Sequence, residues 1–157
     1  MIFKRIGCVL ALVSALFVAS VAPSEAACAG DYRGPLDLAV TRLVTAIKAN
    51  NPSGVLALVG SQGLTIGQEG EPMTAAQLSA DFKARKGRYC DFFTCAGKAG
   101  FLRPLIMGPG IRKAISTANG NIFAVVTINP GSGTSETELH FRYNAQCKWE
   151  LTAIGYL

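Results

Sequence analysis

Two side chains near the C-terminus, His140 and Glu150, have the types that acid–base chemistry needs. Histidine titrates near neutral pH, and a neighbouring carboxylate can orient its ring. If residues 144–146 form a hairpin loop, Phe141 lies opposite Trp149, and His140 lies opposite Glu150 on the other face. The pattern allows a catalytic pair. It also allows an exposed cross-strand pair that only stabilises the sheet, and we favour this second interpretation.

Cysteine usage indicates disulfides rather than metal or redox chemistry. Cys8 lies in a segment that we expect to be removed, and the four others are Cys28, Cys90, Cys95 and Cys147. Four cysteines allow three pairings, of which we predict Cys90–Cys95 and Cys28–Cys147. No C-x-x-C spacing occurs, which disfavours a redox site. His140 is the only histidine, which disfavours a zinc site, so we expect neither a metal nor a cofactor.

A basic cluster and three aromatic residues follow one another in the middle of the chain. Our binding candidates there are Lys83, Arg85, Lys86, Arg88, Tyr89, Phe92 and Phe93. The cations could hold a phosphate, an anionic lipid or an acidic partner. They also suit a solvated helix end, where they complement the negative end of the helix dipole. We favour the solvated helix end and keep the contact surface as the alternative.

Apolar spacing predicts helices in the first half of the chain. Residues from Leu36 to Ile47 include an apolar stripe with spacings of three and four, typical of an amphipathic helix. Asn51 and Pro52 supply a cap and a first turn for a second helix, and residues 74–77 form a capping-box pattern. The expected elements are helices over 35–48, 52–59 and 75–86, with a short strand over 63–67.

The last third of the chain predicts an antiparallel meander. Asn119-Gly120 is a strong hairpin signal, and apolar and polar residues alternate on both sides of the following turns. In the last strand, the alternation places Trp149, Leu151 and Ala153 on one face. The expected strands cover 111–118, 121–128, 135–144 and 147–153, and a short edge strand covers 101–107. Helices followed by an antiparallel sheet predict an α+β fold class.

The N-terminus has the layout of a secretory signal peptide. Lys4 and Arg5 precede an uncharged, apolar run. In Ser24-Glu25-Ala26, small residues lie at the two positions that a signal peptidase reads, with cleavage after Ala26. We therefore predict a signal over 1–26 and a single domain over 27–157, located in a periplasm or secreted. An uncleaved membrane anchor and a lipoprotein modified at Cys28 remain alternatives. The net charge of +5 is too small to indicate nucleic-acid binding.

The order of the expected elements resembles the nuclear transport factor 2-like, or cystatin-like, cone fold. The resemblance depends on the stripe 36–47, the break at Asn51-Pro52, the strand 64–66 and the closing hairpin 136–154. It implies a curved sheet wrapped around the long N-terminal helix, often with an apolar pocket. The superfamily includes isomerases, dehydratases, transport factors and exported proteins without known activity, so the resemblance alone does not fix a function.

We predict an exported, non-catalytic module that binds a small apolar ligand or an envelope protein. It would bind no nucleic acid and would keep no stable membrane span once the signal is cleaved. One alternative is a secreted inhibitor or effector that presents the Cys90–Cys95 loop. Another is an enzyme that uses the cone pocket for proton transfer, with His140 and Glu150 as candidates. No phosphate-binding, dinucleotide-binding or nucleophile-elbow motif occurs in the sequence.

Overall fold

The computed structural model describes residues 30–67, 70–130 and 136–156. The predicted signal segment 1–26 and Cys28 lie outside the described residues. The described helices are α1 (Arg33–Lys48), α2 (Pro52–Leu56), α3 (Ala75–Ala84), α4 (Tyr89–Phe92) and α5 (Leu102–Ile106). None of the helices in these ranges is both long and apolar enough to cross a bilayer.

The five described strands form one sheet in the order β1-β5-β4-β3-β2. Their bounds are β1 (Thr65–Ile66), β2 (Ile111–Ala118), β3 (Asn121–Ile128), β4 (Thr137–Tyr143) and β5 (Trp149–Tyr156). β1 is parallel to β5, and the remaining pairs are antiparallel. The predicted meander is confirmed. Asn119 and Gly120 take φ values of 51° and 77°, as a two-residue hairpin turn requires.

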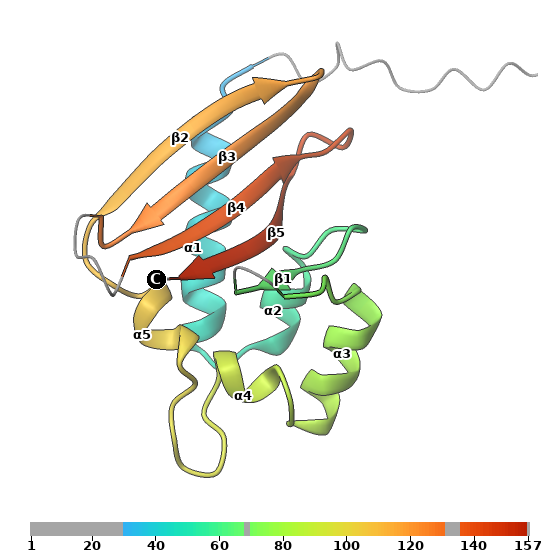
Figure 1. Cartoon of the computed structure of the whole chain (residues 1–157), viewed down its shortest axis with the longest axis vertical. Coiled ribbons are helices and arrows are strands. Elements are labelled where there is room, and N and C mark those ends of the chain that lie inside the picture. Colours follow the sequence, from blue (N-terminus) through green and yellow to red (C-terminus); the bar gives the residue numbers. More distant parts are fainter. Residues whose placement is uncertain (1–29, 68–69, 131–135, 157) are drawn as a thin grey trace, which may run out of the picture.

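Helix α1 lies against one face of the sheet, and the shorter helices gather at one end of it (Figure 1). We call the face away from α1 the outer face. Leu36, Leu43 and Ile47 on α1 are fully buried, as are Leu139 and Leu151 on the sheet. These large side chains occupy the space between helix and sheet. The predicted amphipathic helix and α+β fold class are confirmed.

Side-chain caps fix where the second and third helices begin. Asn51 Oδ1 accepts from the N–H of Gly54 at 3.1 Å, and Thr74 Oγ1 accepts from the N–H of Gln77 at 3.2 Å. The Gln77 side chain accepts in return from the N–H of Thr74 at 2.8 Å, which completes the predicted capping box. Helix α3 ends at Ala84, two residues before the predicted end, because Arg85 has a left-handed φ of 51°.

The strand predicted over 101–107 is wrong, because this segment contains the short helix α5. Pro104 lies in the first turn of that helix. There the backbone N–H groups have no intrahelical acceptor, so a proline costs little. Leu102 and Ile106 lie four residues apart and point into the core, where their exposed fractions are 0% and 2%. Helical spacing of two buried residues, rather than alternation, decides the structure of this segment.

The predicted register of the last hairpin is also wrong. The loop covers 144–148, closed by a hydrogen bond from the N–H of Asn144 to the carbonyl of Lys148 at 2.9 Å. Tyr143, rather than Phe141, therefore lies opposite Trp149. Further along, a β-bulge between β4 and β5 adds one residue to β5, so that His140 lies opposite Ala153.

Candidate functional site

A pocket of about 510 Å³ opens on the outer face of the sheet, over β1, β5 and β4. Its floor contains Gly67, Ala153 and Gly155, three residues with little or no side chain. Gly155 lies opposite Glu138 on β4, and Ala153 lies between Thr65 on β1 and His140 on β4. The hollow therefore exists because neighbouring positions on two paired strands lack bulky side chains.

The β-bulge creates this floor. Leu151 and Ile154 on β5 are both fully buried on the side of α1, although they are three residues apart. Regular alternation would place Leu151 and Ala153 on the same face and would direct Ile154 outward. The extra residue, Thr152, shifts the alternation by one position, and its hydroxyl donates to the carbonyl of His140 at 3.1 Å. The prediction that Ala153 shares the face of Leu151 is therefore wrong.

Three polar side chains line one side of the pocket. They belong to Glu138 and His140 on β4 and to Glu136, which directly precedes β4. These residues occupy alternate positions, so all three lie on the outer face. His140 Nε2 lies 3.2 Å from Glu138 Oε2, and these side chains are 42% and 46% exposed. Tyr156 adds an aromatic wall, and its ring packs edge-on against Phe101 at 5.3 Å. The pocket combines an apolar floor and wall with a carboxylate-bearing rim.

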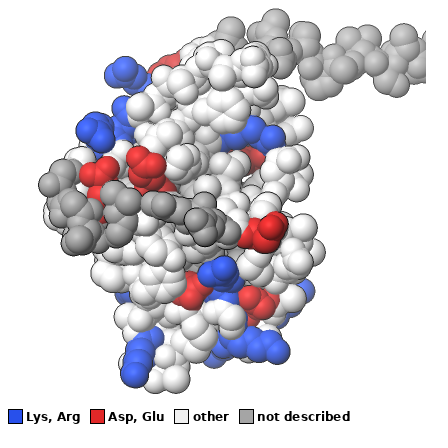
Figure 2. Space-filling view, in the orientation of Figure 1, with Lys and Arg blue, Asp and Glu red and all other residues white. Residues whose placement is uncertain are grey.

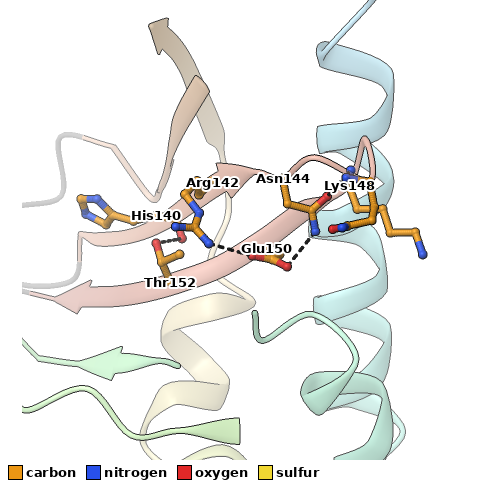
Figure 3. A network of polar contacts seen from close by, with 7 residues as sticks. His140, Arg142, Asn144, Lys148, Glu150 and Thr152 are labelled. Carbon is orange, nitrogen blue, oxygen red and sulfur yellow. Dashed lines mark hydrogen bonds and ion pairs between the residues drawn. The ribbon is translucent and has the colours of Figure 1, made fainter. Parts of the chain in front are cut away.

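The proposed His140–Glu150 pair is not formed, because Arg142 occupies the position opposite Glu150. The Glu150 carboxylate accepts from Arg142 Nη2 at 3.3 Å and from Asn144 Nδ2 at 2.7 Å (Figure 3). Its side chain is 19% exposed. Glu150 therefore ties the two strands of the last hairpin to the loop between them, while His140 contacts Glu138 instead.

Gly60 lets the chain after α2 pass close to Glu150. The N–H of Leu151 donates to the carbonyl of Leu58 at 2.7 Å, which holds this segment against β5. A Cβ atom on Gly60 would overlap the Glu150 carboxylate and lie 3.0 Å from Glu150 Cβ. We therefore expect Gly60→Ala to lower the free energy of unfolding by about 1–3 kcal/mol, as overpacking does, in a urea denaturation experiment.

Two comparisons control this experiment. Gly30→Ala should leave stability unchanged, because a Cβ atom there would meet nothing within 4 Å. The cost of Gly60→Ala should also shrink in a Glu150→Ala background, because the overlapping carboxylate is then absent. An equal cost in both backgrounds would show that the close approach to Glu150 is not the cause.

The basic cluster lies at the end of the molecule formed by α3 and α4. Lys83, Arg85 and Lys86 are exposed, and Arg88 Nη1 pairs with Asp91 Oδ2 at 3.0 Å. Lys and Arg side chains gather at the corresponding lower end in Figure 2. The cations therefore remain accessible at this end of the molecule.

Two of the aromatic binding candidates are unsuited to direct contact with a partner. Phe92 and Phe93 are fully buried and pack with Phe82, at ring-centroid distances of 5.8 Å and 5.4 Å. Tyr89 is half-buried against the same group. These rings support the segment from inside because the short helix α4 turns them toward the core. Among these candidates, Lys83, Arg85 and Lys86 are the exposed side chains.

The predicted disulfide between Cys90 and Cys95 is present, with Cα atoms 5.0 Å apart. Cys147 is also disulfide-bonded. Its pairing with Cys28 stays a prediction, since Cys28 lies outside the described residues. Within the described ranges, no group of three or more His, Cys, Asp or Glu side chains could hold a metal ion.

The sequence predicted His140 and Glu150 as candidates because their side chains can carry out acid–base chemistry. It did not predict the residues of the pocket floor. Gly155 lies inside β5, which runs to Tyr156, but it follows the end of the strand predicted over 147–153, so the sequence pattern did not mark it as a strand glycine. The position of Ala153 could not be read from the sequence, because the bulge that turns it outward leaves no local motif.

No family model matches the chain. A search of the curated proteins finds no match. Among solved structures, the chain is similar to an NTF2-like protein of unknown function from Pseudomonas putida KT2440. The two are 12% identical, with a TM-score of 0.44, and the match covers 85% of this chain and 87% of that one.

Proposed function

We propose that the protein is an exported, non-catalytic binding module and that the outer-face pocket holds a small ligand with an apolar part. The observation that carries this proposal is the floor of Gly67, Ala153 and Gly155 beneath a hollow of about 510 Å³. A pocket of this size with an apolar lining and a few convergent polar groups is typical of small-molecule sites. The space between α1 and the sheet is a poorer candidate, because large buried side chains occupy it.

Export rests on two separate observations. The first 26 residues have the charge and hydrophobicity pattern of a secretory signal. The Cys90–Cys95 disulfide fits an oxidising compartment, where such bonds persist. We therefore propose a periplasmic or extracellular location for residues 27–157.

The two alternative functions receive less support than ligand binding. An acid–base enzyme would now have to use His140 with Glu138, yet both side chains are more than two-fifths exposed. General acids and bases work best in sites that exclude water. An inhibitor that presents the Cys90–Cys95 loop would have to rely on its polar residues, because Phe92 and Phe93 point inward.

Titration with the fluorescent apolar probe N-phenyl-1-naphthylamine tests the proposed function. We expect saturable binding at one site per chain and displacement of the probe by 1-octanol. Fluorescence that rises linearly with probe concentration, with no displacement by octanol, would contradict the proposal. The measurement uses residues 27–157 with the disulfides oxidised.

We also propose that the basic end, defined as Lys83, Arg85 and Lys86, contacts an anionic lipid surface. These exposed cations lie in the last turn of α3 and directly after it. The nearby acidic side chain of Asp91 is already paired with Arg88. Basic residues close to an anionic leaflet each contribute about 1 kcal/mol at low salt, so a few of them give weak, salt-sensitive attachment.

Charge reversal at the basic end should weaken binding to anionic vesicles. Lys83→Glu with Lys86→Glu is expected to lower partitioning into phosphatidylglycerol vesicles roughly tenfold or more, measured by co-sedimentation at low salt. Arg33→Glu with Lys148→Glu makes the same change in net charge at exposed positions elsewhere on the molecule. Equal losses in the two double variants, or binding that does not respond to salt, would contradict a specific basic contact.

A further inference from the structure

We infer that the outer-face pocket selects ligands that carry a cationic group on an apolar body, such as alkylammonium compounds. This inference rests on the proposed function, because it names the ligand class for the same pocket. It depends on the placement of Glu138 beside a floor that has almost no side chains. The proposed function requires only an apolar ligand, so the charge of that ligand is a separate claim.

The register of the sheet places carboxylates along one edge of the floor. Glu136 and Glu138 are two residues apart, so both lie on the outer face, and both line the pocket. Glu138 lies opposite Gly155 on β5 and opposite Thr127 on β3. Neither neighbour carries a positive charge. The Glu138 carboxylate therefore faces the hollow with only the His140 ring in hydrogen-bonding contact among the described residues.

Among the described residues, no Lys or Arg side chain forms an ion pair with the Glu138 carboxylate. Arg142, two residues beyond His140 on β4, is paired with Glu150. Arg112 lies two strands away from Glu138, across Thr127, which corresponds to about 10 Å between the strands. His140 carries a charge only when it is protonated. The Glu138 carboxylate on the β4 edge of the pocket therefore complements a cationic group.

The opposite wall suits the apolar body of such a ligand. Tyr156 lines the pocket and packs edge-on against Phe101, which is 42% exposed and extends the aromatic surface beyond the pocket. Ala153 and Gly155 form the floor between this wall and Glu138. A ligand that spans the floor would place its charge at Glu138 and its chain on the aromatic wall. An anionic ligand in the same orientation would bring like charges together.

Three probes of equal chain length separate the effects of charge and apolar contact. Octylammonium, 1-octanol and octanoate are titrated into the oxidised protein at low salt by isothermal calorimetry. We expect octylammonium to bind about five- to tenfold more tightly than octanol, and octanoate to bind most weakly. Glu138→Gln should reduce the ratio of the affinities for octylammonium and octanol to about one.

Asp37→Asn provides the matched control, because it also removes one negative charge. Asp37 lies on α1, on the opposite face of the sheet, and pairs with Lys113. It should leave the preference for octylammonium intact. If octanol and octylammonium bind equally well to the unmodified protein, the inference is overturned and the proposed function stands. If none of the three probes binds, the proposed function fails as well. A preference for octylammonium that survives Glu138→Gln would also overturn the assignment to this carboxylate.

Discussion

Gly155→Phe is expected to lower the affinity of the protein for N-phenyl-1-naphthylamine by at least about tenfold, which corresponds to about 1.4 kcal/mol of binding free energy. The new ring would lie on the pocket floor and occupy the space of the ligand. The backbone accepts a side chain at this position, because a Cβ atom would meet Glu138 Cβ at 3.9 Å, an ordinary van der Waals distance. Fluorescence titration of the purified variant gives the affinity.

Ala114→Phe is the matched control for this prediction. Ala114 is exposed on β2, which is at the far edge of the sheet from β5. A phenylalanine there adds the same ring away from the pocket and should leave the affinity unchanged. Wild-type affinity in a folded Gly155→Phe protein would show that the probe binds elsewhere. Circular dichroism and the urea midpoint establish that both variants are folded.

Phe93→Ala is expected to lower the free energy of unfolding by about 3–5 kcal/mol, because it removes a fully buried ring and leaves a cavity. Phe93 lies 5.4 Å from the ring of Phe82 and 5.0 Å from the ring of Tyr89, so the cavity would open inside an aromatic cluster. The close packing of its neighbours limits relaxation into the empty space. Urea denaturation followed by circular dichroism measures the loss.

Phe123→Ala removes the same group from an exposed position on β3, where the ring is 36% exposed. Its cost should be clearly smaller than that of Phe93→Ala, because less apolar surface is lost from the interior. If the two substitutions cost the same, the segment around α4 is not packed as described. Phe93 would then be exposed enough to contact a partner.

The sequence was sufficient to predict elements whose signals are local. The stripe from Leu36 to Ile47 identified α1, and the caps at Asn51 and Thr74 located the starts of α2 and α3. The Asn119-Gly120 turn identified the β2–β3 hairpin in the same way. In each case the residues that decide the structure are near one another in the chain, so a single sequence contains the whole pattern.

Features that depend on tertiary contacts were predicted incorrectly. Pro104 suggested an edge strand, whereas burial of Leu102 and Ile106 on one side favours a helical turn. The last hairpin was shifted by two residues because its loop is longer than three residues. The bulge at Thr152 then changed the face on which every later residue of β5 lies.

The candidate site was only partly predictable for the same reason. His140 was identified as a functional candidate and does line the pocket, but its partner is Glu138 rather than Glu150. Glu150 proved to be held in a structural contact with Arg142. The pocket itself depends on small residues brought together by pairing between strands, and the absence of side chains at Ala153 and Gly155 becomes meaningful only once that pairing is known.

We expect the ligand to bind on the outer face of the sheet, and amide chemical-shift mapping tests this location most directly. Titration of ¹⁵N-labelled protein with octylammonium should shift the amide signals of Thr65, Gly67, Ala153 and Gly155 in a saturable manner. Signals from α1 should stay in place. Shifts confined to the buried face of α1, around Leu36 and Leu43, would instead place the ligand between helix and sheet and would contradict the account.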